Sequence, residues 1–241
     1  MSHKIISCTG YGNTGSSAAT NFFEEFSNVL SVGGSEFEFS FLHEADGIID
    51  LFYALTEGHR LKVDLAVKRF LRLVKRLNFA NPLGKNYKDI FNNKFLDFTY
   101  KYLDDLEIIK WNGHWHRLHD VQIVNYNETL VKEKFFNRLI KKNGYKLYEP
   151  DSWRPGLSLR DEMYYGGIDK SKFIEVTKSY LLKLLDEFDP NNQYEYLLFD
   201  QLVPANCNSL YTQLFDNIFV VVVDRDPRDL YFANKVFWNS G

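Results

Sequence analysis

Cysteine is scarce in this chain of 241 residues: Cys8 and Cys207 are the only two, and there is no C-x-x-C pair. A disulfide framework and a cysteine-based zinc site are therefore not expected. No apolar run is long enough to span a membrane, and the chain does not open with a basic segment followed by an apolar one. These absences predict a cytoplasmic protein without a membrane span.

Positive charge is not in excess either, since 29 Lys and Arg residues face 32 Asp and Glu residues, for a net charge of -3. A general nucleic-acid binder needs a basic surface, so we expect no nucleic-acid partner. Aromatic residues are abundant by contrast, with 21 Phe and 15 Tyr, and they predict an aromatic-rich core.

The amino-terminal part of the chain predicts a strand, a loop and a helix. Residues 4–8 are apolar and β-prone, and a glycine-rich turn follows them. The next segment has helical spacing, which places Ala18, Phe22, Phe26 and Leu30 on one expected apolar face. Residues 36–42, EFEFSFL, alternate between polar and apolar side chains and predict a second strand.

The carboxyl-terminal part predicts two more strands, within residues 194–200 and 217–229. The second is the most apolar run of the chain and has no polar alternation, which predicts a central parallel strand buried on both faces. A helix is expected from Pro227, because proline is favoured in a first helical turn. Further helices are expected at about 48–77, 87–110, 128–142 and 171–188.

The fold class that follows is α/β: a P-loop-type parallel sheet flanked by helices, with a mostly helical middle segment. We expect a single domain over residues 1–241. Its sheet comes from about 1–50 and 194–241, and its helical middle spans about 50–190.

The loop after the first strand, G-Y-G-N-T-G-S-S, is almost a phosphate-binding loop of the form G-x-x-x-x-G-K-[S/T], but Ser16 stands in the place of the lysine. Backbone N–H groups and the helix N-terminus do most of the binding in such a loop. The candidate phosphate-binding residues are Gly12, Asn13, Thr14, Gly15, Ser16 and Ser17. The simpler alternative is a plain turn, with Ser17 as a helix cap.

A second candidate segment, D-R-D-P-R-D, places Arg225 and Arg228 just past the expected end of the last strand. Ligands of open parallel sheets bind at this carboxyl edge. The alternative is that both arginines form surface ion pairs with the neighbouring aspartates, which contribute little.

Together the two segments resemble those of the family of sulfotransferases that use 3′-phosphoadenosine-5′-phosphosulfate (PAPS). Residues 43–55 and 196–204 are similar to stretches of bacterial sulfotransferase-like proteins of surface-polysaccharide loci. The resemblance implies PAPS as donor, with the loop on its 5′-phosphosulfate and Arg225 on its 3′-phosphate. It also implies a carbohydrate or glycan acceptor and no metal. The chain departs from the family at Asn13, where the loop usually has a lysine, and at Ala233, where a serine is usual.

Sulfuryl transfer needs a base at the carboxyl edge of the sheet, and His43 and Glu44 directly follow the expected strand at 36–42. His43 is the first choice because its ordinary pKa suits proton transfer at neutral pH, and Asp46 is a weaker option. The alternative for His43 is a turn residue without a role.

Three histidines, His114, His116 and His119, resemble part of a zinc site, but an aromatic loop is the favoured interpretation. Trp111 and Trp115 suit either stacking on a sugar or packing in a core.

Two other functions stay open. A P-loop kinase or NTPase would use Asp200 to hold magnesium, although the missing lysine argues against triphosphate hydrolysis. A non-catalytic nucleotide-binding protein would explain the replacements at Asn13 and Ala233.

Overall fold

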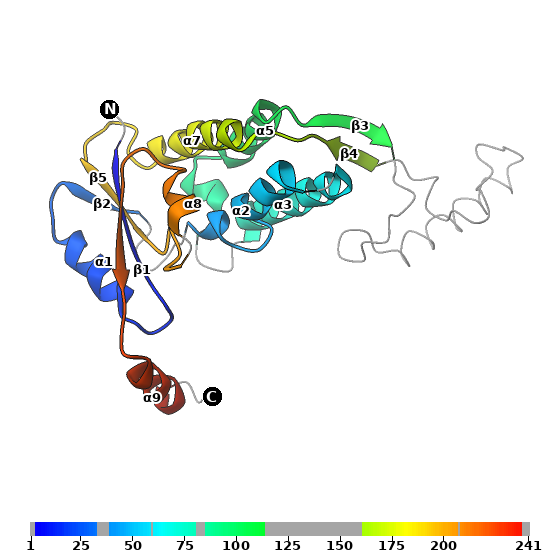
Figure 1. The fold of residues 1–241 in the computed structure, drawn as a ribbon. Helices are drawn as coiled ribbons and strands as arrows, with labels where there is room; N and C mark the ends of the chain where they lie inside the picture. The colour runs from blue at the N-terminus through cyan, green and yellow to red at the C-terminus, as the bar shows by residue number, and fades with distance from the viewer. Residues whose placement is uncertain are drawn as a thin grey trace, which may run out of the picture.

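Four parallel strands form the main sheet, in the order β2-β5-β1-β6. The computed structural model describes residues 3–32, 39–58, 60–80, 85–113, 161–206 and 208–237. The sheet strands are β1 (Lys4–Gly10), β2 (Val29–Ser31), β5 (Tyr196–Asp200) and β6 (Ile218–Val223). Two further strands, β3 (Ile109–Gly113) and β4 (Asp161–Tyr165), pair antiparallel. Both ends of the sequence thus contribute to one sheet, which confirms the predicted α/β fold class (Figure 1).

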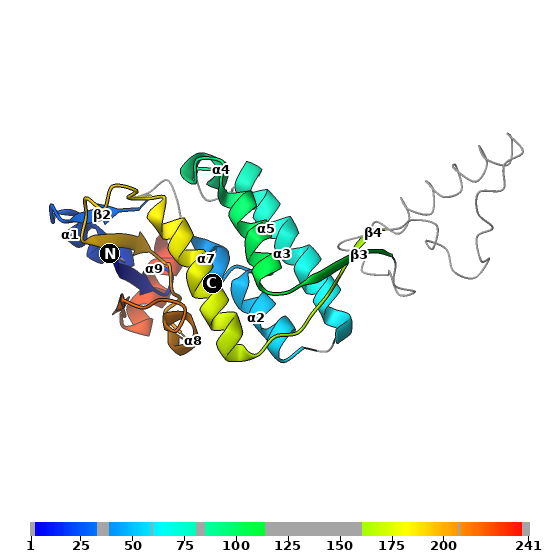
Figure 2. The ribbon, with the colours of Figure 1, turned by 90° about the horizontal axis from the view of Figure 1, so that it is seen from above.

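Helices flank this sheet and make up much of the middle of the chain (Figures 1 and 2). They are α1 (Ser16–Glu24), α2 (Ile48–Thr56), α3 (Arg60–Ala80), α4 (Tyr87–Ile90), α5 (Phe95–Asp105), α7 (Lys170–Asp186), α8 (Asn208–Thr212) and α9 (Pro227–Phe237), with a 3₁₀ turn, η2 (Ser40–Leu42). The predicted helices at 171–188 and from Pro227 are confirmed as α7 and α9. The one at 48–77 is divided into α2 and α3, and 87–110 holds α4, α5 and the start of β3.

The predicted helix at 128–142 lies outside the described residues. Within the described ranges, no helix is long and apolar enough to cross a membrane.

The side chains of β1 point alternately to the two faces of the sheet, and each face is covered differently. Ile5 packs into the large core cluster shared with the helical middle, whereas Ile6 and Cys8 belong to a small cluster beneath α1. The large cluster is rich in aromatic rings, as predicted; Phe39 and Phe41, for example, meet edge to face with their centroids 4.9 Å apart.

The prediction for the most apolar strand was wrong both in its central position and in its burial on both faces. In the described part of the chain β6 pairs only with β1 and lies at the edge of the sheet, and β1 and β5 are the inner strands. The side chains of Phe219 and Val222 are 56% and 47% exposed. None of the six residues of β6 is buried, so the predicted burial on both faces is not found either. An apolar run without polar alternation therefore fixes neither the order of the strands nor their burial.

The strand predicted at 36–42 is also not confirmed: residues 40–42 form η2, and residues 33–38 lie outside the described part. Ser40, Phe41 and Leu42 are all buried, so the polar–apolar alternation does not separate an inner from an outer face. The aromatic side chains of this segment enter the large core cluster between the sheet and the helices, where Phe39 also meets Phe199 of β5.

The first helix is shorter than predicted, and its buried face is a different one. It ends at Glu24, after which Val29–Ser31 form β2 and pair with β5. Its fully buried residues are Ser16 and Thr20, while Phe22 of the predicted apolar face is 62% exposed. Small side chains face the sheet, which lets the helix approach it closely.

Candidate functional site

Three segments of the chain meet at the carboxyl edge of the sheet. β1 ends at Gly10, which is paired with Val223 at the end of β6. β5 ends at Asp200, which is paired with Cys8 of β1. The glycine-rich loop follows β1, Gln201 follows β5, and Arg225 lies two residues beyond β6. The fold therefore brings the two predicted phosphate-binding segments onto the ends of neighbouring strands.

The loop between β1 and α1 has a closely fixed conformation. The N–H and hydroxyl groups of Thr14 both donate to the carbonyl oxygen of Tyr11, at 3.0 and 2.8 Å. Asn13 and Gly15 have left-handed backbone conformations, with φ of 66° and 96°. Asparagine tolerates this conformation and glycine adopts it freely, so the residue types suit the turn.

Two of the loop glycines differ in how much room surrounds them. A Cβ atom on Gly10 would lie 2.1 Å from Oγ1 of Thr14 and 2.8 Å from the carbonyl oxygen of Val223, whereas one on Gly12 would meet nothing within 4 Å. Gly10 is therefore needed for the close approach of the loop to β6.

Gly15 is the N-cap residue of α1. Among the residues that the structure describes, no side chain hydrogen-bonds to the first N–H groups of this helix. The alternative role of Ser17 as a cap is therefore not realised. An uncapped N-terminus leaves backbone donors and the positive end of the helix dipole available to an anion.

Gln201 connects the end of β5 to this loop. Its side-chain oxygen accepts a hydrogen bond from Thr9 at 2.9 Å, and its amide nitrogen donates to Oγ of Ser16 at 3.0 Å. Sequence reasoning missed this residue, although it directly follows a predicted strand and the rule applied to Arg225 would have found it.

The two arginines of the second segment have different surroundings. Arg228 is 89% exposed at its side chain and pairs with Asp226, with 2.6 Å between Nη2 and Oδ2. This pair lowers the pKa of the Asp226 carboxyl. Arg225 donates its backbone N–H to Asp224 at 2.8 Å, and its guanidinium has no partner among the residues that the structure describes. The ion-pair alternative thus holds for Arg228 and not for Arg225.

The loop also contacts the helix that follows the second segment. The side-chain amide of Asn13 donates a hydrogen bond to Oδ1 of Asn234 in α9. Asn234 is the neighbour of Ala233, the position at which the chain lacks the hydroxyl that is usual in the family. One side-chain contact therefore spans the two predicted phosphate sites.

His43 lies at the same edge, although the strand predicted to carry it there does not form. Its ring lies close to the backbone of Leu202, the residue after Gln201, and its buried Nδ1 atom has no hydrogen-bond partner in the described part of the chain. Burial lowers the pKa of His43, and the interaction with the Leu202 backbone opposes this shift. A lowered pKa keeps the ring neutral at pH 7, as a general base requires.

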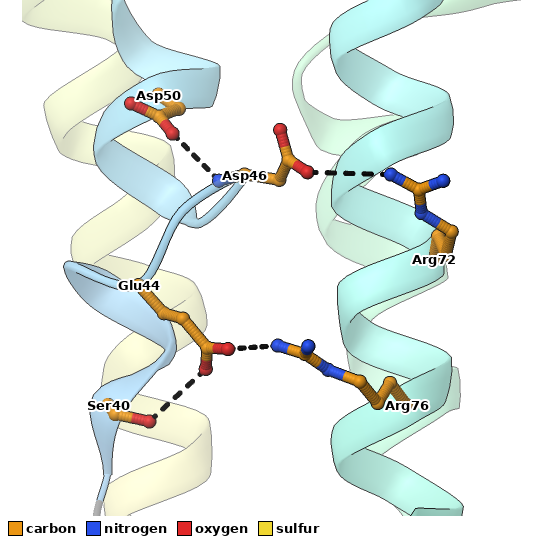
Figure 3. Close-up of polar contacts among 6 residues, drawn as sticks. All are labelled: Ser40, Glu44, Asp46, Asp50, Arg72 and Arg76. Carbon is orange, nitrogen blue, oxygen red and sulfur yellow. Dashed lines mark hydrogen bonds and ion pairs between the residues drawn. The ribbon is translucent and has the colours of Figure 1, made fainter. Parts of the chain in front are cut away.

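Glu44, the second predicted catalytic residue, is engaged elsewhere. Figure 3 shows its carboxylate between Ser40, which donates a hydrogen bond at 3.4 Å, and Arg76 of α3, with which it forms an ion pair. Asp46 likewise pairs with Arg72 of α3 at 3.7 Å. Because Arg76 is half exposed, such a pair contributes no more than about 1 kcal/mol, and its main effect is to hold the His43 turn against α3.

Asp200, the residue proposed to hold magnesium in a kinase, is the last residue of β5. Burial raises its pKa, and its Oδ1 atom is buried without a hydrogen-bond partner in the described part of the chain. In the described ranges, no group of three or more His, Cys, Asp or Glu residues could hold a metal ion. His114, His116, His119 and Trp115 lie outside the described residues, and Trp111 is in β3, far from the carboxyl edge of the sheet (Figures 1 and 2).

Comparisons with known proteins gave no match to a protein-family model, to a curated protein or to a solved structure.

Proposed function

We propose that the protein binds PAPS at the carboxyl edge of its sheet and transfers the sulfuryl group to a carbohydrate hydroxyl. The observation that carries the proposal is the placement of Arg225. Its guanidinium has no partner in the described part of the chain, and it follows β6, the neighbour of the strand that leads into the loop. Two anion-binding elements on adjacent strands suit a nucleotide with phosphate groups on both sides of its ribose.

Each of these residues has a separate role in binding PAPS or in the transfer. The loop N–H groups and the hydroxyl of Ser16 hold the 5′-phosphosulfate, and Arg225 holds the 3′-phosphate through a charge-assisted hydrogen bond. The acceptor oxygen forms a bond to sulfur while the bond from sulfur to the 5′-phosphate oxygen breaks, so that 3′,5′-ADP leaves. His43 takes the proton of the acceptor hydroxyl, which its lowered pKa allows at neutral pH.

A second candidate function, nucleotide binding without catalysis, is favoured by the surroundings of Asn13. The amide of Asn13 is hydrogen-bonded to Asn234, and the guanidinium of Arg228 is paired with Asp226. Neither supplies a free cation for the leaving phosphate, which the family's lysine usually does. The kinase alternative has less support, because Ser16 stands in the place of the lysine that contacts the β and γ phosphates in such enzymes.

Thermal denaturation with 3′,5′-ADP, compared with ATP and magnesium, tests the proposal. A ligand at a hundred times its Kd stabilises the folded state by about 2.7 kcal/mol. For a chain of this size that is a rise in Tm of roughly 5–11 °C. Stabilisation by ATP with magnesium and none by 3′,5′-ADP would overturn the proposal.

The variant Arg225→Ala tests the assignment of the 3′-phosphate. It should weaken 3′,5′-ADP at least tenfold and leave 5′-AMP, which lacks that phosphate, nearly unchanged. Lys235→Ala is the matched control, since it removes one positive charge from α9, where the polar contacts of Lys235 with other described residues are to the ring and hydroxyl of Tyr231. An equal loss of both nucleotides in Arg225→Ala would make the arginine a structural residue.

A further inference from the structure

Gln201 holds an unusual backbone conformation at the end of β5. Its N–H still donates to the carbonyl oxygen of Cys8 at 2.9 Å, but its φ is 54°, in the left-handed region. This conformation is unfavourable for a residue other than glycine. It directs the side chain toward the segment that joins β1 to α1, where three polar groups surround its amide.

The orientation of that amide is determined by its neighbours. The oxygen lies 2.9 Å from the hydroxyl of Thr9, and the nitrogen lies 3.0 Å from Oγ of Ser16 and 3.5 Å from the carbonyl oxygen of Gly10. The opposite orientation would place the amide oxygen against the Gly10 carbonyl, acceptor against acceptor. The nitrogen therefore faces Ser16.

This orientation determines what the Ser16 hydroxyl can do. Its oxygen accepts from Gln201, so its own hydrogen is directed to another group. Ser16 is only 7% exposed, and in the described ranges its hydroxyl hydrogen has no acceptor. A buried donor without an acceptor destabilises the folded protein, and an anion at the uncapped N-terminus of α1 would satisfy it.

We infer that Gln201 is a positioning residue, which keeps the hydroxyl of Ser16 as a donor to the phosphate or sulfate group bound in the loop. The inference rests on the proposed function for the identity of the nucleotide, but not for the presence of an anion. Gln201 acts through Ser16 and does not itself touch the ligand.

The variant Gln201→Glu changes this arrangement with almost no change in size. The carboxylate would accept a hydrogen bond from the Ser16 hydroxyl, which withdraws the donor and adds a negative charge beside the anion. We expect affinity for 3′,5′-ADP to fall at least tenfold at pH 7.5. Protonation of the new carboxyl restores a donor, so the ratio of variant to wild-type affinity should rise toward pH 5.

Gln213→Glu is the matched control, because Gln213 is exposed and its amide donates only to the carbonyl of Ser209. It should leave both the affinity and its pH dependence unchanged. Circular dichroism and the Tm of each ligand-free variant show whether the protein still folds.

Pyrophosphate as a second probe separates this inference from the proposed function. If the wild type binds pyrophosphate but not 3′,5′-ADP, the proposed function is wrong, and the same Gln201→Glu loss measured with pyrophosphate supports the inference. If Gln201→Glu binds as tightly as the wild type, or loses only Tm, the inference is wrong. If the wild type binds neither pyrophosphate nor 3′,5′-ADP, both the proposed function and the inference about Gln201 are wrong.

Discussion

Gly10→Ala is expected to destabilise the protein by an amount that follows from two contacts. The added Cβ would lie 2.1 Å from Oγ1 of Thr14 and 2.8 Å from the carbonyl oxygen of Val223. Thr14 can yield only by rotating away from the carbonyl of Tyr11, to which its hydroxyl donates at 2.8 Å. The Val223 oxygen belongs to the backbone, so β6 itself has to shift.

The lost hydrogen bond costs about 1 kcal/mol, and overpacking of a tight site costs about 1–3 kcal/mol. We therefore expect a loss of about 2–4 kcal/mol in the free energy of unfolding. For a chain of about this length, that corresponds to a fall in Tm of roughly 4–16 °C. Urea denaturation followed by circular dichroism, together with the Tm, measures the effect.

Gly12→Ala is the matched control in the same loop. A Cβ there meets nothing within 4 Å, and Gly12 is not among the residues with positive φ. The substitution should be neutral or should stabilise by about 0.4–1 kcal/mol, because it restricts the unfolded chain.

The double variant Gly10→Ala/Thr14→Ala isolates the side-chain part of the clash. Without Oγ1 of Thr14, the alanine at position 10 should cost less than it does in the wild-type background, a non-additive result for two residues in contact. Equal destabilisation by Gly10→Ala and Gly12→Ala would refute the reasoning, and so would a fully additive double variant.

Two further predictions concern the site. Burial lowers the pKa of His43 below the ordinary 6.5, so the unfolded chain binds more protons than the folded one just below pH 6.5, and stability should fall as the pH drops through that window. His43→Asn should make this fall in stability smaller, as measured by urea denaturation at pH 7.5 and 5.0. An equal fall in the variant and the wild type would contradict the burial of the ring. Asn13→Lys should raise sulfuryl transfer from PAPS by restoring a cation beside the leaving phosphate, at a cost of about 1 kcal/mol for a lysine at φ 66°. If both proteins bind 3′,5′-ADP and neither transfers sulfate to any carbohydrate tested, the non-catalytic alternative is favoured.

The sequence predicts those parts of the fold in which local pattern and tertiary surroundings agree. Residues 4–8, 194–200 and 217–229 do contain strands of a parallel sheet, and α9 begins at Pro227. The order of the strands could not be predicted, because it depends on which partners β6 finds and not on its own composition. Residues 40–42 were misjudged because their alternation arises in a segment that is buried on every side.

In the candidate site, too, the residue types could be read from the sequence and the contacts between distant segments could not. The residue types at Gly10, Gly15 and Arg225 indicate a loop and a cation near the carboxyl edge, and the structure places them there. His43 reaches the edge for a different reason, the contact of its turn with Leu202. The contacts of Gln201 and Asn234 join segments about 190 and 220 residues apart in sequence, and no local pattern specifies such pairs.

The position of β6 has a consequence for how this polypeptide behaves in solution. An edge strand presents a row of backbone donors and acceptors, and a β-branched run of low charge is the composition that pairs most readily with foreign strands. Asp216 and Asp224 flank the run I-F-V-V-V-V, and both are exposed. Charges in these places act as gatekeepers, because a strand that docked on β6 would have to bring its own chain past the carboxylate of Asp224 at one end and the ion pair of Asp216 with Lys178 at the other.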